Sequence, residues 1–259
     1  MNAVVGSGTL ITFPTLLAFG YPPVLANVSN NVGLVPGVAS GVYGYRSELG
    51  RQRRRLIRLG SASVCGGLVG AILLLTLPQS AFTAIVPALI GLAVVMVIVQ
   101  PRLAKWVAER QRARAALAAP DGGAAVGGTS AEAAFAAPNT EEAIGGPVLW
   151  VLVFAAGIYG GYFGAAQGVL LIGMLGIALN DSLQRINAAK NVLAGLVNGL
   201  AAVVFILATH IDWGVAGLIA AGSIIGGQIG ARIGKRLPPW GLRVVIVCVG
   251  TAALVKLLT

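Results

Sequence analysis

The sequence is poor in charge, in aromatic side chains, and in the residues that usually bind metals or form disulfides. Charged residues make up 10% of the 259 positions and aromatic residues 6%. A soluble domain carries about 25% charged residues, so an ordinary soluble protein is excluded. The two cysteines, Cys65 and Cys248, lie in apolar stretches without metal-ligand spacing. We expect them to be small apolar residues of helices.

Acidic residues are missing from every apolar stretch, and all eight lie in predicted loops or at the ends of predicted spans. A proton relay of carboxylates through a membrane therefore has no residue to carry it. The only histidine, His210, lies beside Asp212 at the end of a span, far along the chain from Ser7. Neither a serine hydrolase nor a metal site has local support. We predict that the protein is not an enzyme and has no cofactor.

Long apolar runs are what the sequence does contain. Hydrophobic residues make up 57% of the chain, and 37 glycines allow helix backbones to approach closely in lipid. These runs predict an all-α, polytopic transmembrane helical bundle. The expected helical segments are 4–19, 24–45, 56–77, 81–100, 147–163, 168–179, 186–209, 213–234 and 242–258.

The net charge of +10 is placed as in a membrane protein rather than a nucleic-acid binder. The Lys and Arg residues gather in 46–58, 102–114 and 232–243, and each cluster flanks apolar spans. This is the pattern of the positive-inside rule. We therefore expect the lipid bilayer as a partner and no nucleic acid, and the sequence leaves a homo-oligomer open.

The chain repeats itself at an offset of 160 residues, so that 1–99 align with 161–259 without a gap. The matches gather at Gly, Asn and Pro: Gly8 and Gly168, Asn27 and Asn187, Asn31 and Asn191, Gly66 and Gly226, and Pro78 and Pro238.

Charge indicates that the two repeats are inverted. The loop within 46–58 is strongly basic, whereas its counterpart, 209–212, contains no Lys or Arg. The next loop, 76–80, is neutral, whereas its counterpart carries Lys235, Arg236 and Arg243. Equivalent loops are thus expected on opposite sides of the membrane, which is typical of inverted-repeat transporters.

Inversion requires an odd number of crossings in each repeat, and residues 147–179 supply a broken element. Glycines interrupt this stretch at 160–168, which leaves a second piece shorter than the roughly 20 residues that cross a bilayer. We predict a half-helix or re-entrant arm at the start of each repeat. The first repeat shows only the second piece, 4–19, so we expect about 20 more apolar residues upstream, with the N-terminus outside.

A polar loop joins the halves. Residues 115–146 form a low-complexity Ala/Gly/Pro stretch with scattered acids, which predicts a flexible linker. The expected organisation is a first transmembrane repeat at 1–100, a cytoplasmic linker at 101–146 and a second transmembrane repeat at 147–259, with the C-terminus outside.

Polar residues gather at the breaks and on the helices that follow them. Two half-helix N-termini would attract an anion to a common point near the midplane, where amides and one ammonium add donors. The predicted substrate-binding residues are Ser7, Gly8, Thr9, Asn27, Asn30, Asn31, Gln167, Gly168, Asn187, Lys190 and Asn191. Asn198 belongs to the same polar set. Alternatively, the Asn residues only join helices, and Lys190 extends toward the cytoplasmic surface.

These features predict a permease for a small anion, working by alternating access. Export from an inside-negative cell needs no coupled ion, because the membrane potential contributes about 2.3 kcal/mol per charge per 100 mV. A permease for another small solute, a non-transporting membrane protein and an intramembrane hydrolase are the alternatives. The residues leave open the identity of the anion and the direction of transport.

Several segments resemble the sulfite exporter TauE/SafE family of permeases: 5–17 (VGSGTLITFPTLL), 20–23 (GYPP), 26–27 (AN), 160–168 (GGYFGAAQG) and 187–191 (NAAKN). The resemblance covers nearly the whole chain except the linker. It implies transport of sulfite, sulfonates or related sulfur-containing anions across the bacterial inner membrane. The family's usual first apolar segment is absent here, and the long linker is not part of its core pattern.

Overall fold

The computed structural model describes residues 8–50, 52–117, 146–179, 181–233 and 239–258, and within these ranges the chain is entirely helical. Each of the nine predicted apolar segments overlaps one helix in the described part of the chain. The helices are α1 (Thr9–Ala18), α2 (Pro23–Gly44), α3 (Arg53–Thr76), α4 (Gln79–Leu117), α7 (Pro147–Tyr162), α8 (Gln167–Ala178), α9 (Leu183–Ala208), α10 (Trp213–Ile233) and α11 (Pro239–Leu258), with a short 3₁₀ turn, η1 (Arg46–Leu49), after α2.

Three of these helices are long and apolar enough to cross a membrane by themselves: Arg53–Thr76, Gln79–Arg110 and Leu183–Ala208. The shorter apolar helices include Thr9–Ala18, Pro147–Tyr162 and Gln167–Ala178. The length and composition of these helices confirm a polytopic membrane protein.

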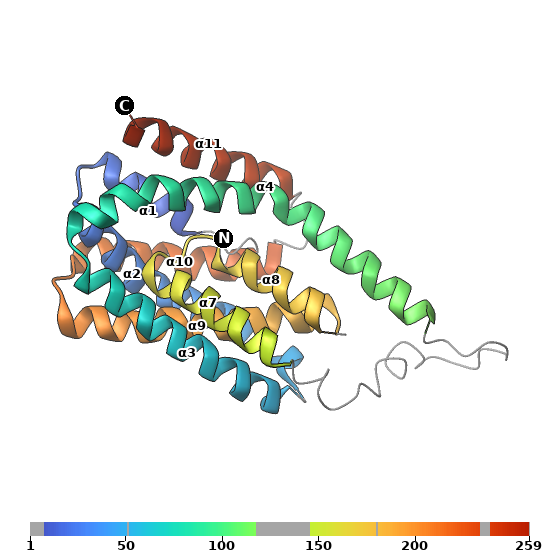
Figure 1. Ribbon diagram of the computed structural model, residues 1–259. Coiled ribbons are helices and arrows are strands. Elements are labelled where there is room, and N and C mark those ends of the chain that lie inside the picture. Colours follow the sequence, from blue (N-terminus) through green and yellow to red (C-terminus); the bar gives the residue numbers. More distant parts are fainter. Residues whose placement is uncertain (1–7, 51, 118–145, 180, 234–238, 259) are drawn as a thin grey trace.

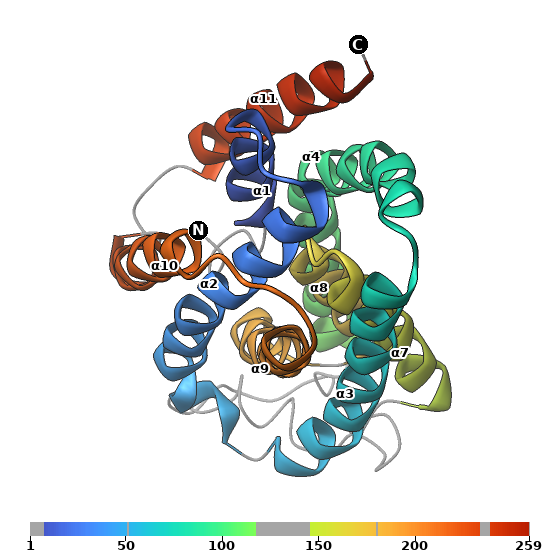
Figure 2. The ribbon, with the colours of Figure 1, turned by 90° about the vertical axis from the view of Figure 1, so that its left-hand side faces the viewer.

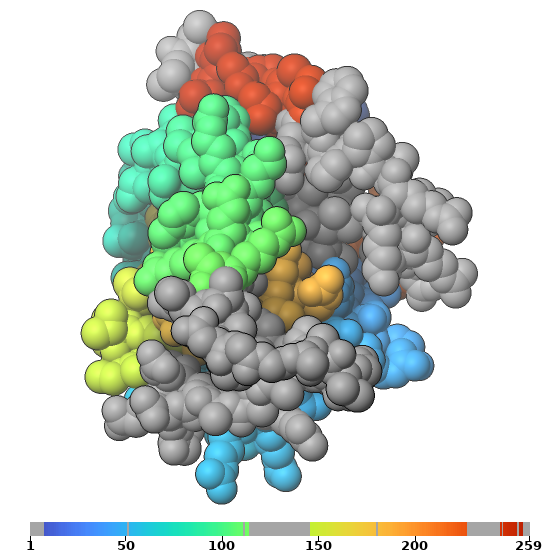
Figure 3. All heavy atoms as spheres, turned by 90° about the vertical axis from the view of Figure 1, so that its right-hand side faces the viewer, coloured from blue at the N-terminus to red at the C-terminus, as the bar shows by residue number. Residues whose placement is uncertain are grey.

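The helices form a bundle with α9 near its centre (Figure 2). α2, α3, α7 and α8 all contact α9, while α10 packs against α2 on the outside of the bundle. α11 lies against α4 and α1, and Figure 3 shows α11 and α4 next to each other on one side of the molecule. α9 is therefore the element against which residues from both halves of the chain can meet.

Connections gather at two opposite ends of the bundle (Figure 1). η1 and the turn from α8 to α9 lie at one end, and the turns from α3 to α4 and from α9 to α10 lie at the other. The basic loop near η1 and its predicted counterpart between α9 and α10 thus lie at opposite ends.

Close backbone packing between α3 and α7 depends on glycine. A Cβ at Gly66 would overlap the carbonyl oxygen of Phe154, and one at Gly70 would overlap that of Ile158. The same is true from the other side, where a Cβ at Gly161 would overlap the carbonyl oxygen of Gly67. Small residues at such an interface let the two backbones touch, which is how helices associate in lipid.

The predicted break after residue 160 is present as four linking residues between α7 and α8. Gly164 has a φ of 76° and Ala166 a φ of 59°, both in the left-handed region, so the chain cannot continue as one helix. An aromatic cluster holds the break in place. The Phe163 ring packs edge-on against the Phe13 ring of α1, with 5.2 Å between the ring centroids, and the centroid of Phe13 lies 6.4 Å from that of Phe82 on α4.

α4 extends further than the apolar pattern predicts. It continues through Pro101 to Leu117, so the first part of the expected linker range 101–146 is helical. Its extension packs across α8, because a Cβ at Gly173 or Gly176 would press on Leu103 or Val107. Residues 118–145 lie outside the described part of the chain.

Candidate functional site

A small cavity lies where α1, α2, α8 and α9 meet. Its volume is about 20 Å³, room for about one water molecule. Its walls bring together residues from both halves of the chain: Thr9, Val38, Gly41, Gly164, Gln167, Gly168, Lys190, Asn191, Ala194 and Asn198. Five of the predicted site residues thus meet at one cavity, namely Thr9, Gln167, Gly168, Lys190 and Asn191.

Two helix N-termini contribute to this cavity. α1 begins at Thr9 and α8 begins at Gln167, and neither helix has a side-chain cap. The first N–H groups of a helix have no partner within it and carry partial positive charge. The starts of α1 and α8 therefore place two positive helix ends beside the same small space.

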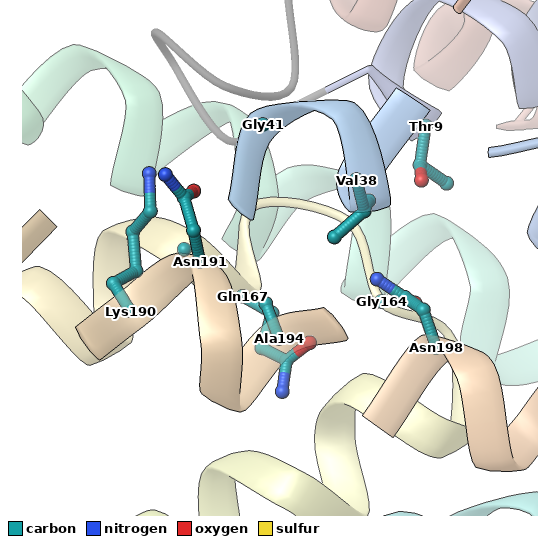
Figure 4. A pocket seen from close by; sticks show the side chains of 10 residues that line it. Thr9, Val38, Gly41, Gly164, Gln167, Lys190, Asn191, Ala194 and Asn198 are labelled. Carbon is teal, nitrogen blue, oxygen red and sulfur yellow. The ribbon is translucent and has the colours of Figure 1, made fainter. Parts of the chain in front are cut away.

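Lys190 is the charged residue of the cavity. It lies on α9, is 1% exposed, and its Nζ has no hydrogen-bond partner among the described residues. Its side chain and that of Asn191 extend next to each other from α9 (Figure 4). A buried ammonium without a partner is costly, so such residues in membrane proteins are rare and usually functional.

Two amides of the cavity also have unused hydrogen-bonding capacity. Nδ2 of Asn191 and both amide atoms of Gln167 are buried without a partner in the described part of the chain. Gln167 reaches toward α7, where a Cβ at Gly160 would overlap its amide. Buried polar groups are normally hydrogen-bonded, so the orphaned atoms indicate a place for a ligand or water.

The predicted α2 asparagines have protein partners instead. Nδ2 of Asn27 donates to the carbonyl oxygen of Tyr162 at 3.0 Å, at the end of α7. Asn30 accepts a short hydrogen bond from the Thr12 hydroxyl. Nδ2 of Asn31 donates to Oδ1 of Asn198 at 3.2 Å, while Oδ1 of Asn31 is buried without a partner in the described structure. These asparagines join α2 to α7, α1 and α9 and do not line the cavity.

The remaining predicted residues lie away from the cavity wall or outside the described residues. Asn187 is half-buried on α9, and the carbonyl oxygen of Gly8 accepts hydrogen bonds from the N–H groups of Ile11 and Thr12. Ser7 lies outside the described residues.

Some residues that line the cavity are not among the predicted site residues. Val38, Gly41 and Ala194 line it with small or apolar groups that carry no chemical signal in a sequence. Asn198 does carry a signal, since it is polar within an apolar helix. Gly164 marks the break itself.

The other charged cluster of the described structure lies apart from the cavity wall. Nη1 of Arg55 lies 2.6 Å from Oδ2 of Asp181, and Nε of Arg185 lies 3.4 Å from Oδ1. This cluster connects the start of α3 to the turn between α8 and α9. The described residues contain no group of three or more His, Cys, Asp or Glu that could hold a metal ion.

A comparison with protein families agrees with this structure. The family described as sulfite exporter TauE/SafE matches residues 1–257. Comparisons with curated proteins and with solved structures give no match. The family match spans essentially the whole chain, and the apolar helices fit a multi-pass membrane protein. The chain therefore belongs to the sulfite exporter TauE/SafE family of membrane transporters.

Proposed function

We propose that the protein is a permease of the bacterial inner membrane that exports a small sulfur-containing oxyanion, such as sulfite or a sulfonate. The observation that carries this proposal is the ammonium of Lys190, buried without a partner in the cavity. An oxyanion would supply the missing counter-charge and would accept hydrogen bonds from Nδ2 of Asn191 and from the N–H group of Gly168 in the first turn of α8.

Internal duplication explains why the site lies on α9. Asn30 and Asn31 of α2 correspond to Lys190 and Asn191 of α9 at the offset of 160 residues. The α2 pair bonds to Thr12 and Asn198, but the residues that correspond to these partners are apolar. They are Ile172 and Val38, so Lys190 and Asn191 lack the partners that Asn30 and Asn31 have. We place a single substrate site there, rather than one in each repeat.

The arrangement of helices supports two inverted repeats. Helix α2 packs against α10 as α9 packs against α3, and α1 packs against α11 as α8 packs against α4. The connection near η1 and its counterpart between α9 and α10 lie at opposite ends of the bundle (Figure 1). At 12 residues, α8 spans about 18 Å, less than the roughly 30 Å of a bilayer core, as expected of a re-entrant arm.

In this proposal, the two repeats transport the anion by alternating access. The cavity holds about one water molecule, whereas sulfite has four heavy atoms, so loading requires the walls formed by α2 and α9 to move apart. Rocking of the repeats about the cavity would open it to each side in turn. With the basic loops inside, residues 101–146 are cytoplasmic, the C-terminus is outside, and the membrane potential drives the anion out.

Sulfite efflux from liposomes containing the purified protein tests the proposal. Lys190→Gln and Asn191→Ala should each abolish or strongly reduce efflux, whereas Asn187→Ala should not, because Asn187 lies on the same helix outside the cavity wall. Wild-type efflux should continue without a proton or sodium gradient. Unchanged efflux in both cavity variants would show that the substrate site lies elsewhere, and strict dependence on an ion gradient would exclude uncoupled export.

A further inference from the structure

We infer that the cavity selects anions with a single charge over anions with two. The inference rests on the proposed function, since it describes the charge of the substrate at that site. It follows from the number of full charges that the cavity wall contains and from their depth in the protein.

Among the described residues that line the cavity, Lys190 is the only one that ionises. The other nine are Thr, Asn, Gln, Gly, Ala and Val residues, which offer hydrogen bonds or apolar contact without a full charge. The Arg55–Asp181–Arg185 cluster carries one net positive charge, but neither arginine lines the cavity, and the Arg185 side chain is 33% exposed, so solvent screens its charge.

The helix ends contribute less than a second full charge. Each N-terminus carries about half an elementary charge, but α8 begins only four residues after the end of α7. The negative C-terminal end of α7 therefore lies beside the positive start of α8 and offsets it. The Asn27 amide caps a carbonyl oxygen at that same C-terminal end, on Tyr162. These partial charges orient an anion without neutralising a second charge.

Because the site is buried, the sum of the ligand charge and the Lys190 charge decides which ligand binds best. An uncompensated charge in a low-dielectric site costs several kcal/mol after relaxation. A monoanion beside Lys190 leaves the site neutral, a dianion leaves one negative charge unpaired, and a neutral ligand leaves the ammonium unpaired. The geometry therefore favours sulfonates and hydrogensulfite over sulfate and thiosulfate.

Three ligands of similar tetrahedral shape test this inference: dimethyl sulfone, methanesulfonate and sulfate, which carry zero, one and two negative charges. Binding of each to the purified full chain would be measured by calorimetry near neutral pH, with sulfite as reference. Methanesulfonate should bind at least about tenfold more tightly than either of the others. The free-energy cost of one uncompensated buried charge is larger than the free energy that corresponds to a tenfold difference in affinity.

Lys190→Gln provides the matched variant, because it keeps a hydrogen-bond donor on a side chain only one atom shorter and removes the charge. The preference for methanesulfonate should disappear, and dimethyl sulfone should bind at least as well as methanesulfonate. Sulfite binding combined with equal or tighter binding of sulfate would overturn the monoanion preference and leave the proposed function intact. If neither sulfite nor any of the three ligands binds, the proposed function fails, and this inference fails with it.

Discussion

Arg55, in the first turn of α3, forms a buried ion pair with Asp181 in the turn between α8 and α9, with 2.6 Å between Nη1 and Oδ2. The side chains are 10% and 6% exposed. Arg185 approaches the other carboxylate oxygen, and its Nη2 donates to the carbonyl oxygen of Gly50 at 3.2 Å. One carboxylate therefore connects the start of α3 to the turn between α8 and α9.

Asp181→Asn should destabilise the protein, because it leaves two arginines near a neutral amide. Removal of one partner from a buried ion pair costs about 3–5 kcal/mol, and the partial exposure here favours the lower end. Thermal unfolding in detergent would measure the loss. Arg53→Gln is the control, because Arg53 lies in the same turn of α3 but is exposed. Equal unfolding temperatures for Asp181→Asn and wild type would show that the pair does not hold the two halves together.

Lys190→Met should raise the stability of the ligand-free protein while it abolishes sulfite efflux. The substitution removes a buried ammonium that has no partner and replaces it with an apolar side chain of similar length, and an unsatisfied buried donor costs about 1–3 kcal/mol. Thermal unfolding and liposome efflux measured on the same preparation would test both effects. Lys105→Met, at an exposed position of α4, should change neither. A fall in stability would mean that Lys190 has a structural role.

Asn31→Ala and Asn191→Ala should have opposite effects, although the two positions correspond in the duplication. Asn31 donates to Asn198, so its removal should cost about 1 kcal/mol of stability and weaken sulfite binding only slightly. Asn191 lines the cavity, and its Nδ2 has no partner among the described residues, so its removal should preserve stability and strongly weaken binding. Calorimetric binding and thermal unfolding separate the two effects. Equal loss of binding in both variants would place Asn31 in the substrate site as well.

Gly66→Ala should destabilise the bundle by about 1–3 kcal/mol, the usual cost of overpacking, because the new methyl group would overlap the carbonyl oxygen of Phe154. Gly91→Ala is the matched control, since Gly91 is also within a helix but a Cβ there meets nothing within 4 Å. That substitution should stabilise α4 slightly through its higher helix propensity. Thermal unfolding of both variants would compare them, and an equal response would show that α3 and α7 can move apart at little cost.

Much of the fold is predictable because the bilayer limits the choice of structure. Apolar runs of spanning length must be helical, since every backbone polar group in lipid needs a partner within its own segment. The nine segments and the break at 163–166 follow from this rule and from glycine. The position at which α4 ends does not follow from the sequence in this way. Pro101 and the following basic residues suggest that the helix stops, but Leu103 and Val107 pack against Gly173 and Gly176 of α8 and the helix continues.

The candidate site could be predicted only in part from the sequence. A sequence reveals polar residues inside apolar helices, but it does not distinguish those that bind a ligand from those that join helices. The amino-acid sequence by itself determined a helical membrane protein with a glycine-rich break between α7 and α8, and it predicts two related halves with polar residues after each break. Only the tertiary structure decided which polar residues are already paired. Oδ1 of Asn30 and Nδ2 of Asn31 meet Thr12 and Asn198, whereas Nζ of Lys190 and Nδ2 of Asn191 are buried without a partner among the described residues. Hydrogen-bond partners come from other helices, and helix packing decides which side chains face one another.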